Sequence, residues 1–244
     1  MAKLKGMLQF TGNLDGISFY EMDGKIIVRK TSGFTGSAIK TQDNYVRTRE
    51  NATEFGHCTI VGKQLRQALA LYIKKCKTPD VHSRLVGVLS KIMKCDKVSE
   101  RGKRTVALGL GTPEGKQLLN GFECNPGVPL HHMVATPYHV LMAEGKIVFD
   151  PFAPEAVIFP VAATHLCLQF LILRCDFENG IFTLGEGEKV VVSKGNTLPG
   201  LELVASNPEG NGMVIGLVFG EFRQQINGEI YALEGCGLKV VGVG

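Results

Sequence analysis

Residues 165–175 read HLCLQFLILRC and residues 213–223 read MVIGLVFGEFR. They are the longest strand-like runs in the chain, and they predict the two central strands of one sheet. Shorter candidates surround them, separated by turn signals such as Asn179-Gly180 and Asn227-Gly228. Many short strands at regular spacing are typical of an antiparallel β-sandwich, which we expect over residues 122–244. The shorter candidates are residues 138–142, 146–149, 156–159, 181–184, 189–193, 201–205, 229–233 and 238–243.

Residues 41–96 have a different character, with many Lys, Arg, Leu and Ala and apolar residues at helical spacing. They predict an αα-hairpin whose first helix covers residues 41–77, with a break or kink at Gly56 or Gly62. Thr78-Pro79 predicts the start of the second helix, because Thr caps helices and Pro fits their first position.

The first 30 residues predict a small β-meander. Asp23-Gly24 is a strong hairpin signal, and residues 13–16 read as a turn. Three short strands rarely stand alone, so this sheet is expected to pack on something or to join another sheet. A flexible loop is predicted to follow over residues 31–40. The expected strands are residues 7–11, 17–21 and 25–30.

These patterns together predict an α+β fold with an N-terminal β-meander, a central αα-hairpin and a C-terminal antiparallel β-sandwich. The net charge is only +4, but residues 1–104 hold 20 Lys and Arg against 9 Asp and Glu, whereas residues 105–244 hold 7 against 14. We therefore predict a basic part (residues 1–104), a linker (residues 105–121) and an acidic sandwich (residues 122–244). Such segregation suggests a partner for each part: nucleic acid, another protein or a neighbouring copy.

The first 16 residues, MAKLKGMLQFTGNLDG, contain no apolar run of signal-peptide length, so we expect no secretory export. The most apolar stretch, residues 162–173, is too short to span a bilayer, and no membrane partner is expected. Seven cysteines without a CxxC pair fit buried free thiols in a reducing compartment. The expected location is therefore cytoplasmic.

Motifs that would carry chemistry are incomplete. Residues 109–116 read GLGTPEGK, but Glu114 stands where a dinucleotide fingerprint needs Gly, and the Walker A template fails as well. His131, His132 and His139 have no Cys or acidic residue at ligand spacing. The sequence contains neither GxSxG nor HExxH. We therefore expect no catalytic group, cofactor or metal, and predict that the protein is not an enzyme.

Basic residues on the two predicted helices suggest one alternative, which is electrostatic binding of nucleic acid. No aromatic stacking motif accompanies them, so a solvated helix face is the preferred interpretation, and a contact with the acidic part of a neighbouring copy is a third. These residues are Lys63, Arg66, Lys74, Lys75, Lys77, Arg84, Lys91 and Lys94.

Several short motifs resemble a family of uncharacterised proteins from the Bacteroidota. They cover residues 3–96, and the resemblance implies a shared architecture without an activity to carry over. The motifs are Lys5-Gly6, residues 12–20 (GNLDGISFY), Asp23-Gly24, residues 28–30 (VRK), residues 47–51 (RTREN), residues 54–56 (EFG), Gly62-Lys63 and residues 65–69 (LRQAL).

The RTREN stretch places charges on one side of the first helix, since Glu50 and Glu54 share a face. This cluster is predicted either to lock the meander to the helix or to dock a neighbouring subunit. The candidate partner interface consists of Arg47, Arg49, Glu50, Glu54, Phe55, Lys63 and Arg66.

The leading hypothesis from these observations is a non-enzymatic structural protein that self-assembles into a tube, filament or shell. The contacts would run head to tail between basic and acidic halves. The alternatives are a nucleic-acid-binding protein that uses the basic helices, and a carbohydrate- or ligand-binding sandwich suggested by fold analogy.

Overall fold

The computed structural model divides the chain into two compact units, Met1–Arg49 and Glu50–Gly244. The boundary lies in the first turn of helix α2 (Val46–Ala68), and not after residue 104, where the charge balance changes. The difference arises because the helices that follow residue 50 bury their apolar faces on the C-terminal sheet. The structure describes residues 2–3, 11–31, 36–150, 152, 157–195 and 200–244.

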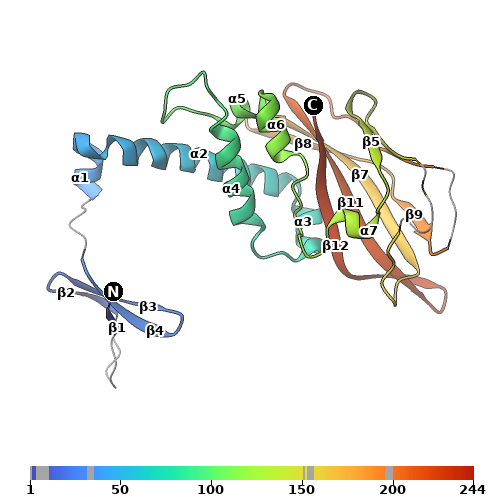
Figure 1. Cartoon of the computed structure of the whole chain (residues 1–244), viewed down its shortest axis with the longest axis horizontal. Coiled ribbons are helices and arrows are strands. Elements are labelled where there is room, and N and C mark those ends of the chain that lie inside the picture. The colour runs from blue at the N-terminus through green and yellow to red at the C-terminus, as the bar shows by residue number, and fades with distance from the viewer. Residues whose placement is uncertain (1, 4–10, 32–35, 151, 153–156, 196–199) are drawn as a thin grey trace. The chain divides into compact units, whose positions relative to one another are not determined.

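The first unit contains an antiparallel sheet in the order β1-β4-β3-β2 (Figure 1). The predicted hairpin at Asp23-Gly24 is confirmed, with positive φ at both residues as a tight two-residue turn requires. The predicted turn over residues 13–16 is shorter, because Asn13 and Leu14 already pair with β3 and leave only Asp15-Gly16 in the turn. The strands are β1 (Ala2–Lys3), β2 (Gly12–Leu14), β3 (Ile17–Met22) and β4 (Lys25–Lys30).

Two other predictions for the first unit, a strand over residues 7–11 and a loop over residues 31–40, are not confirmed. The expected strand over residues 7–11 lies, except for Thr11, outside the described residues. The flexible loop expected over residues 31–40 is partly helical, since α1 spans Gly36–Thr41; the short η1 (Asp43–Tyr45) follows it. Arg49 donates hydrogen bonds to the carbonyls of Ile39 (2.7 Å) and Gln42 (2.9 Å), which holds the end of α1 in place.

The second unit is built on a five-stranded antiparallel sheet in the order β12-β11-β7-β8, with β9 also paired to β7. β7 and β11 are confirmed as central strands, because each has partners on both sides. The two predicted strands at 229–233 and 238–243 are one strand, β12. The bounds are β7 (His165–Asp176), β8 (Ile181–Glu186), β9 (Val190–Ser193), β11 (Met213–Ile226) and β12 (Glu229–Val243).

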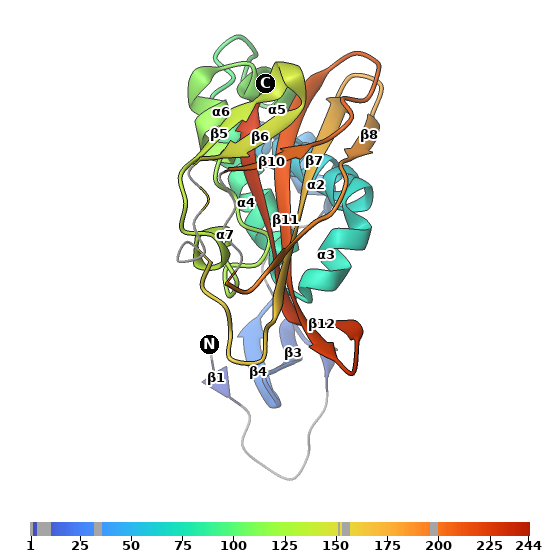
Figure 2. The same cartoon turned by 90° about the vertical axis from the view of Figure 1, so that its right-hand side faces the viewer.

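A smaller antiparallel sheet, in the order β10-β6-β5, packs on one face of the large sheet (Figure 2). Its strands are β5 (Tyr138–Leu141), β6 (Lys146–Phe149) and β10 (Leu201–Val204). The two sheets thus pack as the predicted sandwich does. The strand expected over residues 156–159 is reduced, in the part described, to a single bridge between Val157 and Val134.

Helices cover the other face of the large sheet (Figure 2), an arrangement that the sequence did not predict. The covering helices are α2, α3 (Ala70–Cys76), α4 (Val81–Met93), α5 (Val106–Leu110) and α6 (Pro113–Leu119). The short α7 (Leu130–Met133) and η2 (Met142–Glu144) pack instead with the smaller sheet. No helix in the described residues is both long and apolar enough to cross a membrane.

The break in the first predicted helix lies at Leu69, between α2 and α3, and not at Gly56 or Gly62. Gly62 is buried and continues the helix. A Cβ at Gly62 would lie 3.3 Å from a methyl group of Val86, so the glycine lets α2 and α4 approach closely. The second helix begins at Val81, two residues after the predicted Thr78-Pro79 start.

Residues 105–121 are folded helices and not a linker. Thr105 and Thr112 accept backbone hydrogen bonds at the starts of α5 and α6. The buried side chains of Val106, Leu110 and Leu119 join the core that the helices share with the large sheet. The glycines of GLGTPEGK therefore serve close packing.

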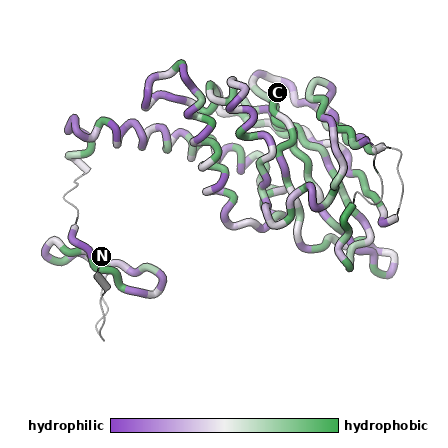
Figure 3. Tube along the Cα trace, in the orientation of Figure 1, coloured by the Kyte–Doolittle hydropathy of each residue, from purple (hydrophilic) through white to green (hydrophobic). Residues whose placement is uncertain are grey.

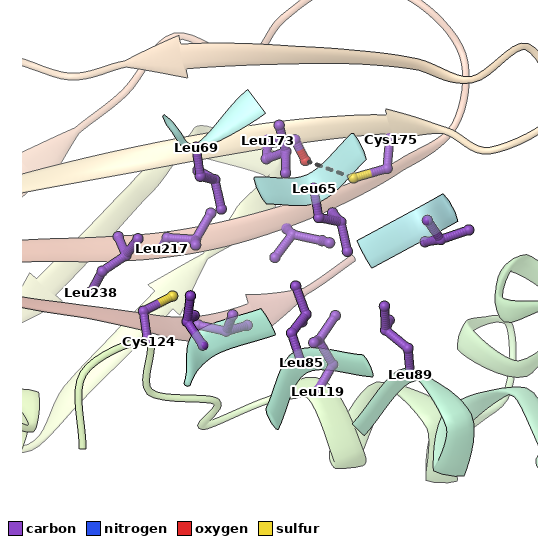
Figure 4. Packing of buried hydrophobic residues seen from close by; sticks show 14 of the residues in the cluster. Leu65, Leu69, Leu85, Leu89, Leu119, Cys124, Leu173, Cys175, Leu217 and Leu238 are labelled. Carbon is purple, nitrogen blue, oxygen red and sulfur yellow. Dashed lines mark hydrogen bonds between the residues drawn. The ribbon is translucent and has the colours of Figure 1, made fainter. Parts of the chain in front are cut away.

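The two faces of β7 divide the core of the second unit. Leu171, Leu173 and Cys175 face the helices, where Leu65 of α2 and Leu69, between α2 and α3, meet them (Figure 4). Phe170, Ile172 and their neighbours face the smaller sheet. Each fully buried side chain of this size contributes about 1.5–3 kcal/mol. Figure 3 shows the result, with mostly hydrophobic strands in the large sheet and a hydrophilic loop between α4 and α5.

Close packing of α5 on α4 gives a testable prediction. A Cβ at Gly109 would lie 2.1 Å from the carbonyl oxygen of Ile92, so Gly109→Ala should destabilise the protein by about 1–3 kcal/mol. The matched control is Gly87→Ala, because Gly87 is exposed within α4 and its Cβ would meet open space. That change should stabilise the protein by about 0.5–1 kcal/mol. Urea unfolding measures both, and equal stability of the two variants would contradict the packing.

Candidate functional site

A buried ion pair joins α2 to the loop that follows α4. Glu54 is only 4% exposed and accepts hydrogen bonds at 2.7 Å from both Nε and Nη2 of Arg104. The backbone N–H of Gly102 donates a further bond at 2.8 Å. The Arg104 hydrogen bonds outweigh burial and hold the pKa of Glu54 below its ordinary value.

The same loop is held at three more points. Asp96 accepts backbone hydrogen bonds from Val98, Ser99 and Thr105, all at 3.0 Å. Burial raises the pKa of Asp96, but these bonds outweigh it and the pKa is lowered. Glu50 pairs with Arg101 at 3.1 Å, and Nε2 of His57 accepts from the backbone of Val106 at 3.1 Å. These contacts order the hydrophilic loop of Figure 3 against α2.

The candidate interface residues therefore do not form one surface. Glu50 and Glu54 hold the loop within the second unit, a role that the sequence does not predict. Arg49 is engaged by carbonyls of the first unit. Phe55 is 59% exposed and Lys63 is exposed. An interface role for Arg47, Phe55, Lys63 and Arg66 remains a prediction.

Arg66 is half-buried, and its Nε finds no hydrogen-bond partner in the part of the chain that the structure describes. The eight cations predicted to form a basic stripe also have different surroundings, and three of them are bound within the second unit. Lys75 and Lys77 pair with carboxylates of the sheet, at 3.3 Å and 2.8 Å. Arg84 donates to the carbonyls of Glu123 and Cys124. Part of the charge complementarity between the two halves is thus used within one chain.

The helix-facing surface of the large sheet becomes polar beside α3. Glu221 of β11 is 4% exposed, and its register neighbours are Cys167 of β7 and Cys236 of β12. Lys75 of α3 approaches Glu221 to 3.3 Å, and Arg223 binds it from β11. Burial raises the pKa of Glu221, but the two cations outweigh it, so the carboxylate stays ionised at neutral pH.

This polar region opens into a pocket of about 250 Å³. Cys236 lines the pocket, and its Sγ lies 3.2 Å from Sγ of Cys76, the last residue of α3. Two carboxylates, two ammonium groups and a thiol thus converge, which is the composition of a reactive or binding site. Sequence reasoning missed this pocket, because its parts lie far apart in the chain and each resembles an ordinary core or surface residue. The lining residues are Lys75, Lys77, Glu221, Ala232, Leu233, Glu234, Gly235 and Cys236.

A second depression, of about 440 Å³, is acidic. Exposed Glu186, Glu188 and Glu202 line it, together with Val190 and Val204. Lys146 is 3.9 Å from Glu202 but lies closer to Glu144, at 3.2 Å. We call this surface, defined by its three glutamates, the acidic groove.

The three histidines considered as a metal cluster do not lie on one element. His131 and His132 lie on α7 with ring centroids 4.4 Å apart, whereas His139 lies on β5. Among the described residues, no group of three or more His, Cys, Asp or Glu side chains could hold a metal ion.

The chain matches no protein-family model, no curated protein and no solved structure.

The buried pair of Glu54 and Arg104 predicts a large effect of one substitution. Arg104→Met leaves a buried carboxylate without its cation and should cost about 3 kcal/mol at neutral pH. Lys103→Met is the matched control, since its pair with Glu100 is exposed, is screened by solvent and should contribute little to stability. Chemical denaturation measures both, and a loss for Arg104→Met as small as the control's would contradict the assignment.

The lowered pKa of Glu54 also predicts a pH dependence. Below its ordinary value of 4.5, the unfolded chain binds the proton more readily than the folded chain. The stabilisation by Glu54 is therefore complete above that pH and is lost as the pH falls through the folded value. The thermal midpoint should fall more steeply between about pH 6 and pH 3 in the wild type than in Glu54→Gln. Parallel curves would contradict this contribution.

Proposed function

We propose that this protein is a non-enzymatic structural protein that assembles with copies of itself into a tube, filament or shell. The observation that carries the proposal is the exposed sheet of the first unit. Among its described residues, only Ile26 and Ile27 are buried apolar side chains. Leu14, Ile17 and Met22 are between 40% and 63% exposed. A sheet with so little core gains stability by packing its apolar side chains on another surface.

The edge of this sheet supports the same proposal. In the described part of the chain, β2 has a hydrogen-bonded neighbour on one side only, which is β3. Its outer N–H and C=O groups are a template for an added strand. A contact of this kind between unlike surfaces of neighbouring copies repeats along an assembly and gives rings or filaments.

Charge suggests which surfaces meet. Lys25, Arg29 and Lys30 are exposed on β4, and the acidic groove exposes Glu186, Glu188 and Glu202. Because Lys75 and Lys77 are already paired within the second unit, we assign the basic side of the contact to β4. Attraction between exposed charges is screened over about 10 Å at 0.1 M salt, so the assembly should weaken as salt is added.

Charge exchange on the full chain tests the proposal. Sedimentation velocity at low salt should show large assemblies of the wild type. The triple change Glu186→Lys, Glu188→Lys and Glu202→Lys should abolish them, and so should Lys25→Glu with Lys30→Glu. Combining both sets makes the groove basic and β4 acidic, so the two surfaces attract again and assembly should return. Glu209→Lys, an exposed carboxylate outside the groove, is the control.

A wild-type monomer at high concentration and low salt would overturn self-assembly. Assembly that neither charge set affects would overturn the assigned contact. A monomer that binds duplex DNA with a steep salt dependence would favour the nucleic-acid alternative.

A further inference from the structure

Two thiols from distant parts of the chain meet between α3 and β12. Cys76 and Cys236 are separated by 160 positions, and their sulfurs lie 3.2 Å apart. Both residues are 5% exposed or less. A disulfide requires about 2.05 Å between the sulfurs, so a movement of about 1 Å would bring them to bonding distance.

The two sulfurs have unequal surroundings. Cys236 lines the pocket that contains Lys75 and Lys77, whereas Cys76 does not line it. The hydrogen bond between the thiols lowers the pKa of Cys236 and raises that of Cys76. Lys75 favours the Cys236 thiolate, while burial and the carboxylate of Glu221 oppose it. Of the two thiols, Cys236 is thus the one that ionises more readily, and it is the one that lines the pocket.

We propose that Cys76 and Cys236 form a reversible disulfide when the protein meets a hydroperoxide. The Cys236 thiolate attacks one peroxide oxygen, the O–O bond breaks, and hydroxide leaves and is protonated to water. Cys236 is then a sulfenic acid. The sulfur of Cys76 attacks the sulfur of Cys236, the S–S bond forms, the S–O bond breaks, and the second oxygen leaves as water with the Cys76 proton. The two thiols lose two electrons, and hydrogen peroxide gains them. A dithiol reductant reverses the change by exchange.

The other five cysteines are unsuited to this reaction. Cys58, Cys124, Cys167 and Cys175 are buried, and burial raises the pKa of each, to about 12 for Cys124 and Cys175. Cys95 is half-buried, and its sulfur lies 3.6 Å from the carbonyl oxygen of Lys91. It is the most accessible thiol without a neighbouring thiol contact in the structure, which makes it the control.

The bond would have a mechanical consequence. It would join the end of α3 to β12, and so tie the helical layer of the second unit to the large sheet. Closing a loop of 160 positions restricts the unfolded chain strongly. The oxidised protein should therefore melt about 5–15 °C above the reduced protein.

The test treats the reduced full chain with hydrogen peroxide, in equimolar amount, under native conditions. Peptide mapping without reductant should show the Cys76–Cys236 link, and the count of free thiols should fall from seven to five. Dithiothreitol should return both the thiols and the melting temperature to their starting values. Cys95→Ser should behave as the wild type. Cys76→Ser should accumulate a sulfenic acid on Cys236 that dimedone traps, and Cys236→Ser should form no link.

Peroxide that oxidises Cys95 first and leaves both pocket thiols reduced would overturn the proposal. So would a link between chains in place of the link within one chain. If either pocket variant fails to fold, the wild-type peptide map and thiol count still decide, because they require no substitution.

Discussion

The central strands β7 and β11 bury apolar side chains on both faces of the large sheet. The arrangement of the second unit follows from the need to cover both faces. The smaller sheet protects one face and the helical layer the other, so the central strands are apolar with almost no alternation. Removing either layer would expose a continuous apolar surface to water. This requirement also explains why the unit boundary lies before Glu50, far from the change in charge at residue 104.

Polar groups inside this arrangement hold the layers in register. Glu54 with Arg104 fixes the loop after α4 against α2, and Glu221 with Lys75 fixes α3 against β11. Each buried carboxylate requires its cation, because an unpaired charge at these positions would lose its hydration without compensation. The charge difference between the two halves is therefore partly a consequence of docking within one chain. Exposed charges on β4 and in the acidic groove remain for a neighbour, and these carry the proposal of assembly.

Local signals were reliable where one or two residues decide a conformation. Asp23-Gly24 and Asn227-Gly228 form the expected hairpin turns with positive φ, and the two longest apolar runs are the central strands. The predictions for glycines are wrong where the glycine allows two helices to pack closely. The pattern predicts a helix break at Gly62 and a linker at Gly109, yet both glycines allow close packing of helices. The reason a position needs glycine depends on its neighbour in space, which periodicity does not contain.

Local patterns in the sequence are sufficient to predict the α+β class, the central strands, the helical character of residues 41–96 and the tight hairpin turns. All of these depend on φ preferences and on hydrophobic periodicity within a few residues. Which surface each apolar face packs against, and which distant groups meet, depends on the three-dimensional fold. Glu54 meets Arg104 across 50 positions, and Cys76 meets Cys236 across 160. An apolar stripe shows that a face is buried but does not identify its partner, because many pairings of helices and sheets bury similar areas.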